Sequence, residues 1–248
     1  MTSLTDYVWF GAGLLIIVAA TMALARLSGV GLGWAPLWSL TRAAIQLTVV
    51  ALLLRGILTA SWAVAGFLVL MATTASWTAA GRLRELYGGR RAAVLGVVTG
   101  ATVALVLIFA LGLVDLNVRY LVAVAGIIIG NAMSAATLSG RNFLRGVRLR
   151  KDEIEGWLAL GATPSEAHLE IGRDAVRESL LPNLDQTRST GLVTLPGAFV
   201  GALFGGASPA QAAQFQLVVL AGIALAMTTC GIIVTRLCGR SPYVATVS

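Results

Sequence analysis

The sequence has little charge, a single lysine, a single histidine and only two cysteines. Charged residues make up 12% of the 248 positions and hydrophobic residues 57%, whereas about a quarter of a soluble domain is charged. The mean hydropathy of +0.86 excludes an ordinary soluble globular domain. Short alternating segments typical of a membrane β-barrel are also missing. We therefore expect an all-α integral membrane protein, with a single membrane domain over residues 1–248.

Several kinds of chemistry have no residues to support them. The chain has no G-x-x-x-x-G-K-[ST] loop, and Lys151 lies in a basic stretch, so we expect no bound nucleotide or other cofactor. His168 is the only histidine, while zinc sites need three or four clustered ligands; we expect it to be a solvated helix residue. Cys230 and Cys238 fall in and just after the last apolar stretch, as packing residues rather than a disulfide. We do not expect an enzyme.

Long apolar stretches are what the chain does contain. A helix of about 20 apolar residues crosses the hydrocarbon layer of a membrane. The sequence predicts about seven such spans, at 7–25, 38–54, 61–80, 92–114, 120–138, 190–204 and 215–235.

Positive charge is distributed in a way that indicates orientation. The net charge is +7, and of the 18 Lys and Arg residues only Arg55 and Arg119 lie in the loops that would be external. Cytoplasmic loops collect Lys and Arg, so we expect a multi-pass plasma-membrane protein with its N-terminus outside and its C-terminus in the cytoplasm. The basic charge then sets topology, and no nucleic-acid partner is implied.

A charged helical insertion at about 139–188 interrupts the apolar pattern. An apolar stripe at helical spacing should end at Gly161, since glycine readily adopts the left-handed conformation at a helix end. Thr163, Pro164 and Glu166 then form the signature of a capping box that opens a second helix. Pro182 should end or bend that helix. Two short helices meeting at a glycine elbow favour docking onto another protein.

The predicted span at 190–204 is short and carries Pro196 near its middle, so we expect a kinked helix. Transporters often build their pathway from spans interrupted by Gly or Pro; the alternative is a kinked packing helix. Glycines four residues apart favour close helix contacts within or between subunits. They are Gly96 and Gly100, Gly126 and Gly130, and Gly197, Gly201 and Gly205.

Polar side chains inside the spans are few. Gln46 lies one helical turn after Arg42, and Asn131 lies in the middle of its span with Met133 two residues on. An amide in hydrocarbon needs a hydrogen-bond partner. These residues either join helices or line a cavity for a polar or cationic substrate.

Several stretches of the sequence resemble a specific family. The stretch E-G-W-L-A-L-G-A-T-P, from Glu155 to Pro164, resembles the cytoplasmic coupling loop of ABC transporter permeases. Five further stretches are together similar to the FetB-type permeases. They are R-A-A-I-Q-L at 42–47, G-N-A-M at 130–133, and R-D-A-V-R-E-S-L-L-P, G-L-V-T-L-P-G and G-G-A-S-P within 173–209. That family comprises bacterial iron-export permeases and plant half-transporters linked to aluminium tolerance.

The resemblance implies a homodimeric half-transporter that exports a metal ion or small polar solute. It would be driven by a separate cytosolic ABC ATPase that binds ATP and Mg²⁺. The ATPase contact would comprise Glu155, Leu160, Gly161, Ala162, Thr163 and Pro164. The translocation pathway would lie nearest to Gln46, Asn131, Met133, Pro196 and Gly197.

The chain also departs from that family. Ala198 and Phe199 stand where methionines are common, and Ala202 where glutamine is frequent; since methionine sulfur is a soft metal ligand, this weakens the argument for a metal cargo. Leu181-Pro182 also comes later than the Leu-Pro of importer loops. Two alternatives stay open: a membrane-embedded lipid enzyme, for which the spans hold almost no titratable residues, and a scaffold that binds a partner without transport.

Overall fold

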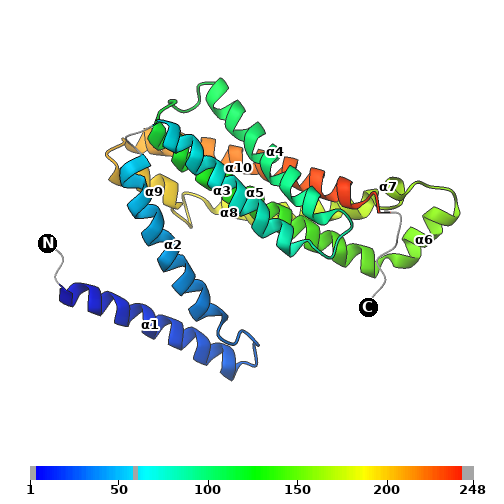
Figure 1. The fold of residues 1–248 in the computed structure, drawn as a ribbon, viewed down its shortest axis with the longest axis horizontal. Coiled ribbons are helices and arrows are strands. Elements are labelled where there is room, and N and C mark those ends of the chain that lie inside the picture. The colour runs from blue at the N-terminus through cyan, green and yellow to red at the C-terminus, as the bar shows by residue number, and fades with distance from the viewer. Residues whose placement is uncertain (1–3, 58–60, 242–248) are drawn as a thin grey trace. The chain divides into compact units, whose positions relative to one another are not determined.

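The computed structural model describes residues 4–57 and 61–241, and these residues form helices joined by short loops (Figure 1). The all-helical fold class is confirmed. The chain divides into two compact units, residues 1–60 and 61–248, and its expected organisation as one domain stays a prediction. The first unit contains α1 (Leu4–Leu27) and α2 (Ala35–Ile57). The guanidinium carbon of Arg26, in the last turn of α1, lies 5.6 Å from the centre of the Trp34 ring in the loop before α2.

Four long helices build the second unit: α3 (Ser61–Arg82), α4 (Gly89–Ala110), α5 (Val118–Leu149) and α10 (Pro209–Cys238). Helix α10 packs along both α4 and α5. Small residues let the backbones approach, which is how membrane helices gain packing energy. A methyl group added at Gly100 would lie 2.6 Å from the Ala226 carbonyl oxygen, so this contact needs glycine.

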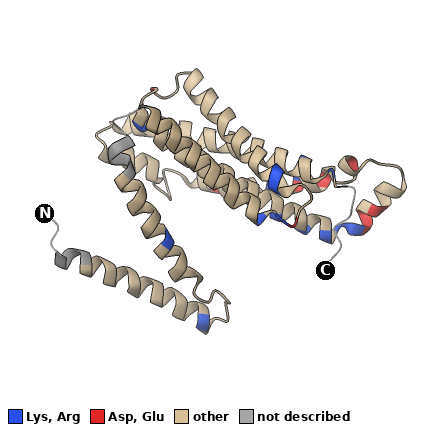
Figure 2. Cartoon of the chain, in the orientation of Figure 1, with Lys and Arg blue, Asp and Glu red and all other residues tan. Residues whose placement is uncertain are grey.

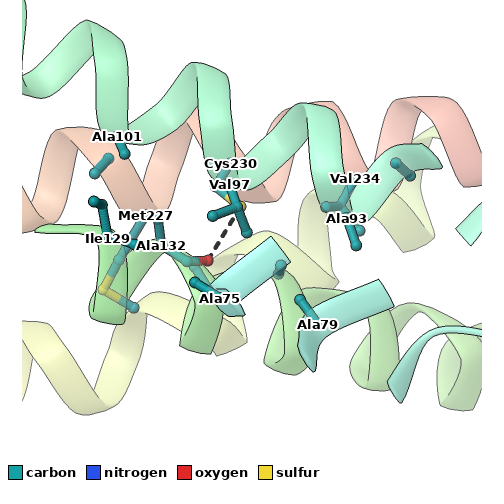
Figure 3. Close-up of a cluster of buried hydrophobic side chains, with 14 of the residues drawn as sticks. Ala75, Ala79, Ala93, Val97, Ala101, Ile129, Ala132, Met227, Cys230 and Val234 are labelled. Carbon is teal, nitrogen blue, oxygen red and sulfur yellow. Dashed lines mark hydrogen bonds between the residues drawn. The ribbon is translucent and has the colours of Figure 1, made fainter. Parts of the chain in front are cut away.

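Figure 3 shows the centre of this packing, where α3, α4, α5 and α10 meet through alanine, valine and cysteine side chains. The Cys230 thiol donates to the Ala132 carbonyl oxygen at 3.3 Å, and both Cys230 and Cys238 are buried. Their prediction as packing residues is confirmed, as is the close contact at Gly96 and Gly100. Gly130, Gly197 and Gly201 have no neighbour within 4 Å of an added methyl group in the described part of the chain.

The charged insertion is helical but is not a separate body. Helix α5 has 32 residues, about 48 Å, so it extends well beyond a hydrocarbon layer of about 30 Å. It breaks at Arg150 into α6 (Lys151–Ala159), followed by α7 (Pro164–Ala167) and α8 (Leu169–Ser189). Helix α8 returns against α5 and α10. It continues through Pro182, so of the two predicted effects of this proline the helix end is wrong and the bend stays a prediction. Pro182 is exposed, and solvent can satisfy the carbonyl that loses its donor.

The predicted kinked span at 190–204 is also wrong in detail. Residues 190–196 are irregular, and only α9 (Gly197–Phe204, eight residues) is helical. Pro196 precedes α9 with ψ 146° instead of kinking its middle. Proline fits the entrance of a helix because it has no N–H to leave unpaired, and Gly191 within the irregular stretch has φ +95°.

Six helices, α1 to α5 and α10, are long and apolar enough to cross a membrane among the described residues. The packing of α5 against α10 indicates a further pass of the chain along the bundle between them. Tyr120 and Phe215, near the starts of α5 and α10, have ring centres 5.4 Å apart, and a methyl group at Gly239, after α10, would lie 3.8 Å from Phe143 near the other end of α5. The two helices are therefore parallel. The chain between them returns along the bundle through α8, residues 190–196 and α9.

Candidate functional sites at the two ends of the bundle

Charged side chains gather at one end of the second unit, around α6 and α7 (Figure 2). We call this the basic end; it carries Arg82, Arg148 and Arg236 at the last turns of α3, α5 and α10. Residues 150–168, called the elbow below, project from it. The opposite end carries the loop 111–117 between α4 and α5.

The elbow turns at the predicted glycine. Helix α6 ends at Leu160, and Gly161 has φ +93°, a conformation that costs other residues strain. The Thr163 amide donates to Glu166 Oε2 at 2.8 Å, and the Glu166 amide donates to Thr163 Oγ1 at 3.4 Å. The predicted capping box is confirmed. Hydrogen bonds from the Thr163 backbone and hydroxyl lower the pKa of Glu166.

Two contacts fix α6 to the rest of the protein. Ile154 is fully buried. Arg150 donates to both carboxylate oxygens of Glu153, at 2.7 and 2.8 Å, and to Asp174 of α8 at 3.2 Å. These bonds raise the pKa of Arg150 and lower that of Glu153. A force applied to α6 would therefore reach α5 and α8 directly.

His168 lies inside the elbow and not on its surface, which corrects the prediction of a solvated residue. Its side chain is buried, with its ring centre 5.8 Å from that of Phe143. Nδ1 lies 2.7 Å from the Pro164 carbonyl oxygen; because a carbonyl only accepts, Nδ1 carries the proton. His168 thus packs the junction between α7 and α8. In the residues that the structure describes, no three His, Cys, Asp or Glu side chains cluster as a metal site.

The outer face of the elbow is an apolar patch surrounded by charge. Leu160 is 83% exposed and Trp157 51% exposed, while Glu155 pairs with Lys151 across one helical turn at 3.4 Å. The predicted contact residues Leu160 to Pro164 lie together here, with Glu155 on the preceding helix. Trp157 was not predicted, although a tryptophan within a charged helix is a sign of an interface.

The predicted pathway residues are more scattered. The Asn131 amide donates to the Ile127 carbonyl oxygen in its own helix at 2.8 Å, so it does not join two helices through this bond. Met133 is half-buried against the bundle core. Pro196 and Gly197 lie at the start of α9, and Gln46 is exposed on α2. Their role in a pathway stays a prediction.

A cavity of about 780 Å³ lies at the end opposite the elbow, bounded by α9, the loop before α5 and the first turns of α10. Asn117 and Gln211 on its wall already cap helices. In the described part of the chain, the side chains of Asp115, Arg119 and Gln214 have no hydrogen-bond or ion-pair partner. Sequence reasoning missed all three, because each is an ordinary polar residue near a helix end.

Ala198, Gly201 and Ala202 of α9 line this cavity, so the G-L-V-T-L-P-G segment leads into its wall. A family model described as "Uncharacterised protein family (UPF0014)" matches residues 9–243. The chain belongs to the UPF0014 family. This membership confirms the resemblance to FetB-type permeases, and it covers both units of the chain.

The relatives include plant and bacterial proteins. The chain is 35% identical over 225 residues to "UPF0014 membrane protein STAR2" of Oryza sativa subsp. japonica, covering 90% of this chain and 79% of that protein. It is 32% identical to "Protein ALUMINUM SENSITIVE 3" of Arabidopsis thaliana, covering 93% and 85%. It is 31% identical to "Probable iron export permease protein FetB" of Escherichia coli K12, covering 74% and 71%. No solved structure matches the chain.

Proposed function

We propose that this protein is the membrane permease subunit of an ABC transporter, powered by a separate cytosolic ATPase. The observation that carries the proposal is the elbow, whose exposed Leu160 and Trp157 form an apolar patch on a polar end of the molecule. An exposed apolar patch rimmed by polar residues is typical of a protein-binding site. The name of the E. coli relative, an iron export permease, supports the same function.

Helix α8 connects the elbow to the cavity. Movement of an attached ATPase would push on Gly161, and Ile154 and Arg150 would pass that movement to α5 and α8. The chain runs from α8 through the irregular residues 190–196 into α9, which lines the cavity. Broken helices that line a cavity are how many transporters change the side to which a site opens. Asn131 and Met133 would lie along the path between the two ends.

A second copy of the chain would complete the transporter. Gly197 and Gly201 of α9 are open to an incoming neighbour, and close contact between such faces is a common mode of membrane helix association. The cargo we propose is a metal ion or a small polar solute, exported from the cytoplasm. Asp115 and Gln214 supply oxygen ligands at the outer cavity, although Ala198 and Ala202 offer no soft ligand.

Docking can be tested by co-purifying the protein with candidate ABC ATPase subunits from the same organism and measuring ATPase stimulation. L160D should abolish both, since it places a charge in the centre of the patch. L116D is the matched control, because Leu116 is 75% exposed in the loop at the opposite end. Equal binding and stimulation by both variants would rule out the docking role.

Reconstituted vesicles separate the remaining alternatives. ATP-dependent movement of iron or another solute supports the permease. Partner binding without movement of any solute would indicate a scaffold, and turnover of lipid without the ATPase would indicate an enzyme.

A further inference from the structure

A groove at the basic end has not been assigned any role so far. It lies between α8 and the last turns of α10, has a volume of about 680 Å³, and is formed by two facing rows of side chains. The helices come close at its floor: a methyl group added at Gly172 would lie 3.4 Å from the Thr235 side chain. Val176 and Thr235 on the floor are buried. Gly172 thus lets the two helices close the floor of the groove, while larger side chains form its sides.

Both sides of the groove carry arginine pairs. Arg173 and Arg177 are four residues apart on α8, whereas Arg236 lies in the last turn of α10 and Arg240 just after that helix. Like charges at this spacing destabilise a helix. Only Arg173 has a carboxylate within ion-pair distance in the described part of the chain, Glu170 at 3.3 Å, and both of these side chains are about two-thirds exposed. The other three guanidinium groups leave the groove strongly positive.

The remaining lining is apolar. Val176 and Leu180 of α8 and Ile232 of α10 continue the groove toward the centre of the bundle, and Ile232 is 36% exposed. A ligand that fits both parts has a negatively charged head and a hydrocarbon tail. Basic pockets between membrane helices on the cytoplasmic side are suited to acidic lipid head groups.

We propose that this groove binds the phosphate of an anionic phospholipid, with an acyl chain along Val176, Leu180 and Ile232. The guanidinium groups of Arg177 and Arg236, one from each side, donate to the phosphate oxygens, since arginine is well matched to this geometry. A bound lipid would join α8 to α10 at the base of the elbow. This inference does not depend on the ATPase or on the cargo.

The test uses the whole protein, purified in detergent and loaded with phosphatidylglycerol or phosphatidylcholine, with the bound lipid counted by native mass spectrometry. R177Q/R236Q should weaken phosphatidylglycerol binding about 25-fold, since each of two basic residues near an acidic lipid surface contributes about fivefold. R90Q/R141Q is the matched control: it removes the same charge from exposed sites at the same end, outside the groove. R173Q/R240Q tests the groove with the other two arginines and should also weaken binding.

Each outcome decides the proposal. Selective retention of phosphatidylglycerol, lost in both groove variants and kept in the control, supports it. Equal loss in all three variants would show general surface attraction and overturn it. Inorganic phosphate that displaces the lipid at equal molar concentration would identify a free-anion site and also overturn it. Lipid binding to the monomer but not to a dimer would show that a second copy covers the groove, and it would also overturn the proposal. Unfolding temperatures measured without lipid check that the variants are folded.

Discussion

At the scale of single residues, the elbow depends on hydrogen bonds to a carboxylate whose protonation changes with pH. Glu166 accepts from the amide and hydroxyl of Thr163, and these bonds lower its pKa from the ordinary value of 4.5. A lowered folded-state pKa means that the carboxylate stabilises the fold above pH 4.5, and that this contribution is lost as the pH falls through the lower, folded value. The start of α7 should therefore loosen in acid.

This expectation can be tested on the wild type and two variants by hydrogen exchange of peptides from residues 157–170, corrected for intrinsic rates. In the wild type, protection should decline below pH 4.5. E166Q should keep most of the protection and lose its pH dependence, because glutamine also completes a capping box. T163A should lower protection at every pH, by about 1 kcal/mol. If E166Q shows the same pH dependence of protection as the wild type, a group other than Glu166 is responsible for it.

Glycine at 161 and proline at 182 show where residue patterns are informative. A glycine followed by T-P-x-E predicts a helix end and a capping box from local chemistry alone, and both are present. Pro182 has the same local tendency to end a helix, yet α8 continues past it. The difference lies in tertiary contacts, because Ser179 and Asn183 on either side of Pro182 are buried and hold the helix in place.

At the scale of helices, α5 and α8 are joined by a buried hydrogen-bond chain. Ser139 donates to Ser179 Oγ at 2.9 Å, and Ser179 donates to the Val176 carbonyl oxygen at 2.7 Å. Both side chains are almost completely buried. These hydrogen bonds run in one direction, from Ser139 to Ser179 and on to Val176. Replacing one serine should therefore affect stability differently from replacing the other.

S179A should destabilise the protein by about 1–3 kcal/mol, because it leaves the buried Ser139 hydroxyl without its acceptor. S139A should cost less, since Ser179 keeps its bond to Val176. The double variant should cost less than the sum of the two. Thermal unfolding in detergent measures these differences, with S134A as control, whose hydroxyl donates within its own helix to Gly130. Equal and additive costs would contradict the proposed direction.

Hydropathy predicted the long continuous helices and failed for the interrupted segment between α8 and α10. The predicted spans at 61–80, 92–114 and 215–235 lie within α3, α4 and α10 to within a few residues. The stretch 190–204 is just as apolar, but hydropathy measures only how well side chains suit an apolar environment. It does not report whether the backbone is helical. Gly191, Pro196 and Gly197 leave that stretch free to be irregular. The cavity polar groups escaped prediction because only the fold brings Asp115 and Gln214 to one wall.

At the scale of the whole molecule, the parallel arrangement of α5 and α10 bears on the number of membrane crossings. With α1 and α2 as two spans, the second unit adds α3, α4, α5, the return through α8 and α9, and α10. Seven crossings would be an odd number, which the distribution of Lys and Arg also predicts. Six helices of the described residues are long and apolar enough to cross alone, and the orientation of the termini stays a prediction.

Single cysteines introduced at three exposed loop positions test this topology. L160C lies on the elbow, whereas L113C and S208C lie at the opposite end. A maleimide that cannot cross membranes should label L113C and S208C from outside intact cells, and L160C only in inverted vesicles, in accordance with basic loops on the cytoplasmic side. The wild type is the control, because Cys230 and Cys238 are buried and should react slowly. Labelling of S208C and L160C from the same side would mean that α8 and α9 do not cross, and it would exclude the parallel arrangement of α5 and α10 in the membrane.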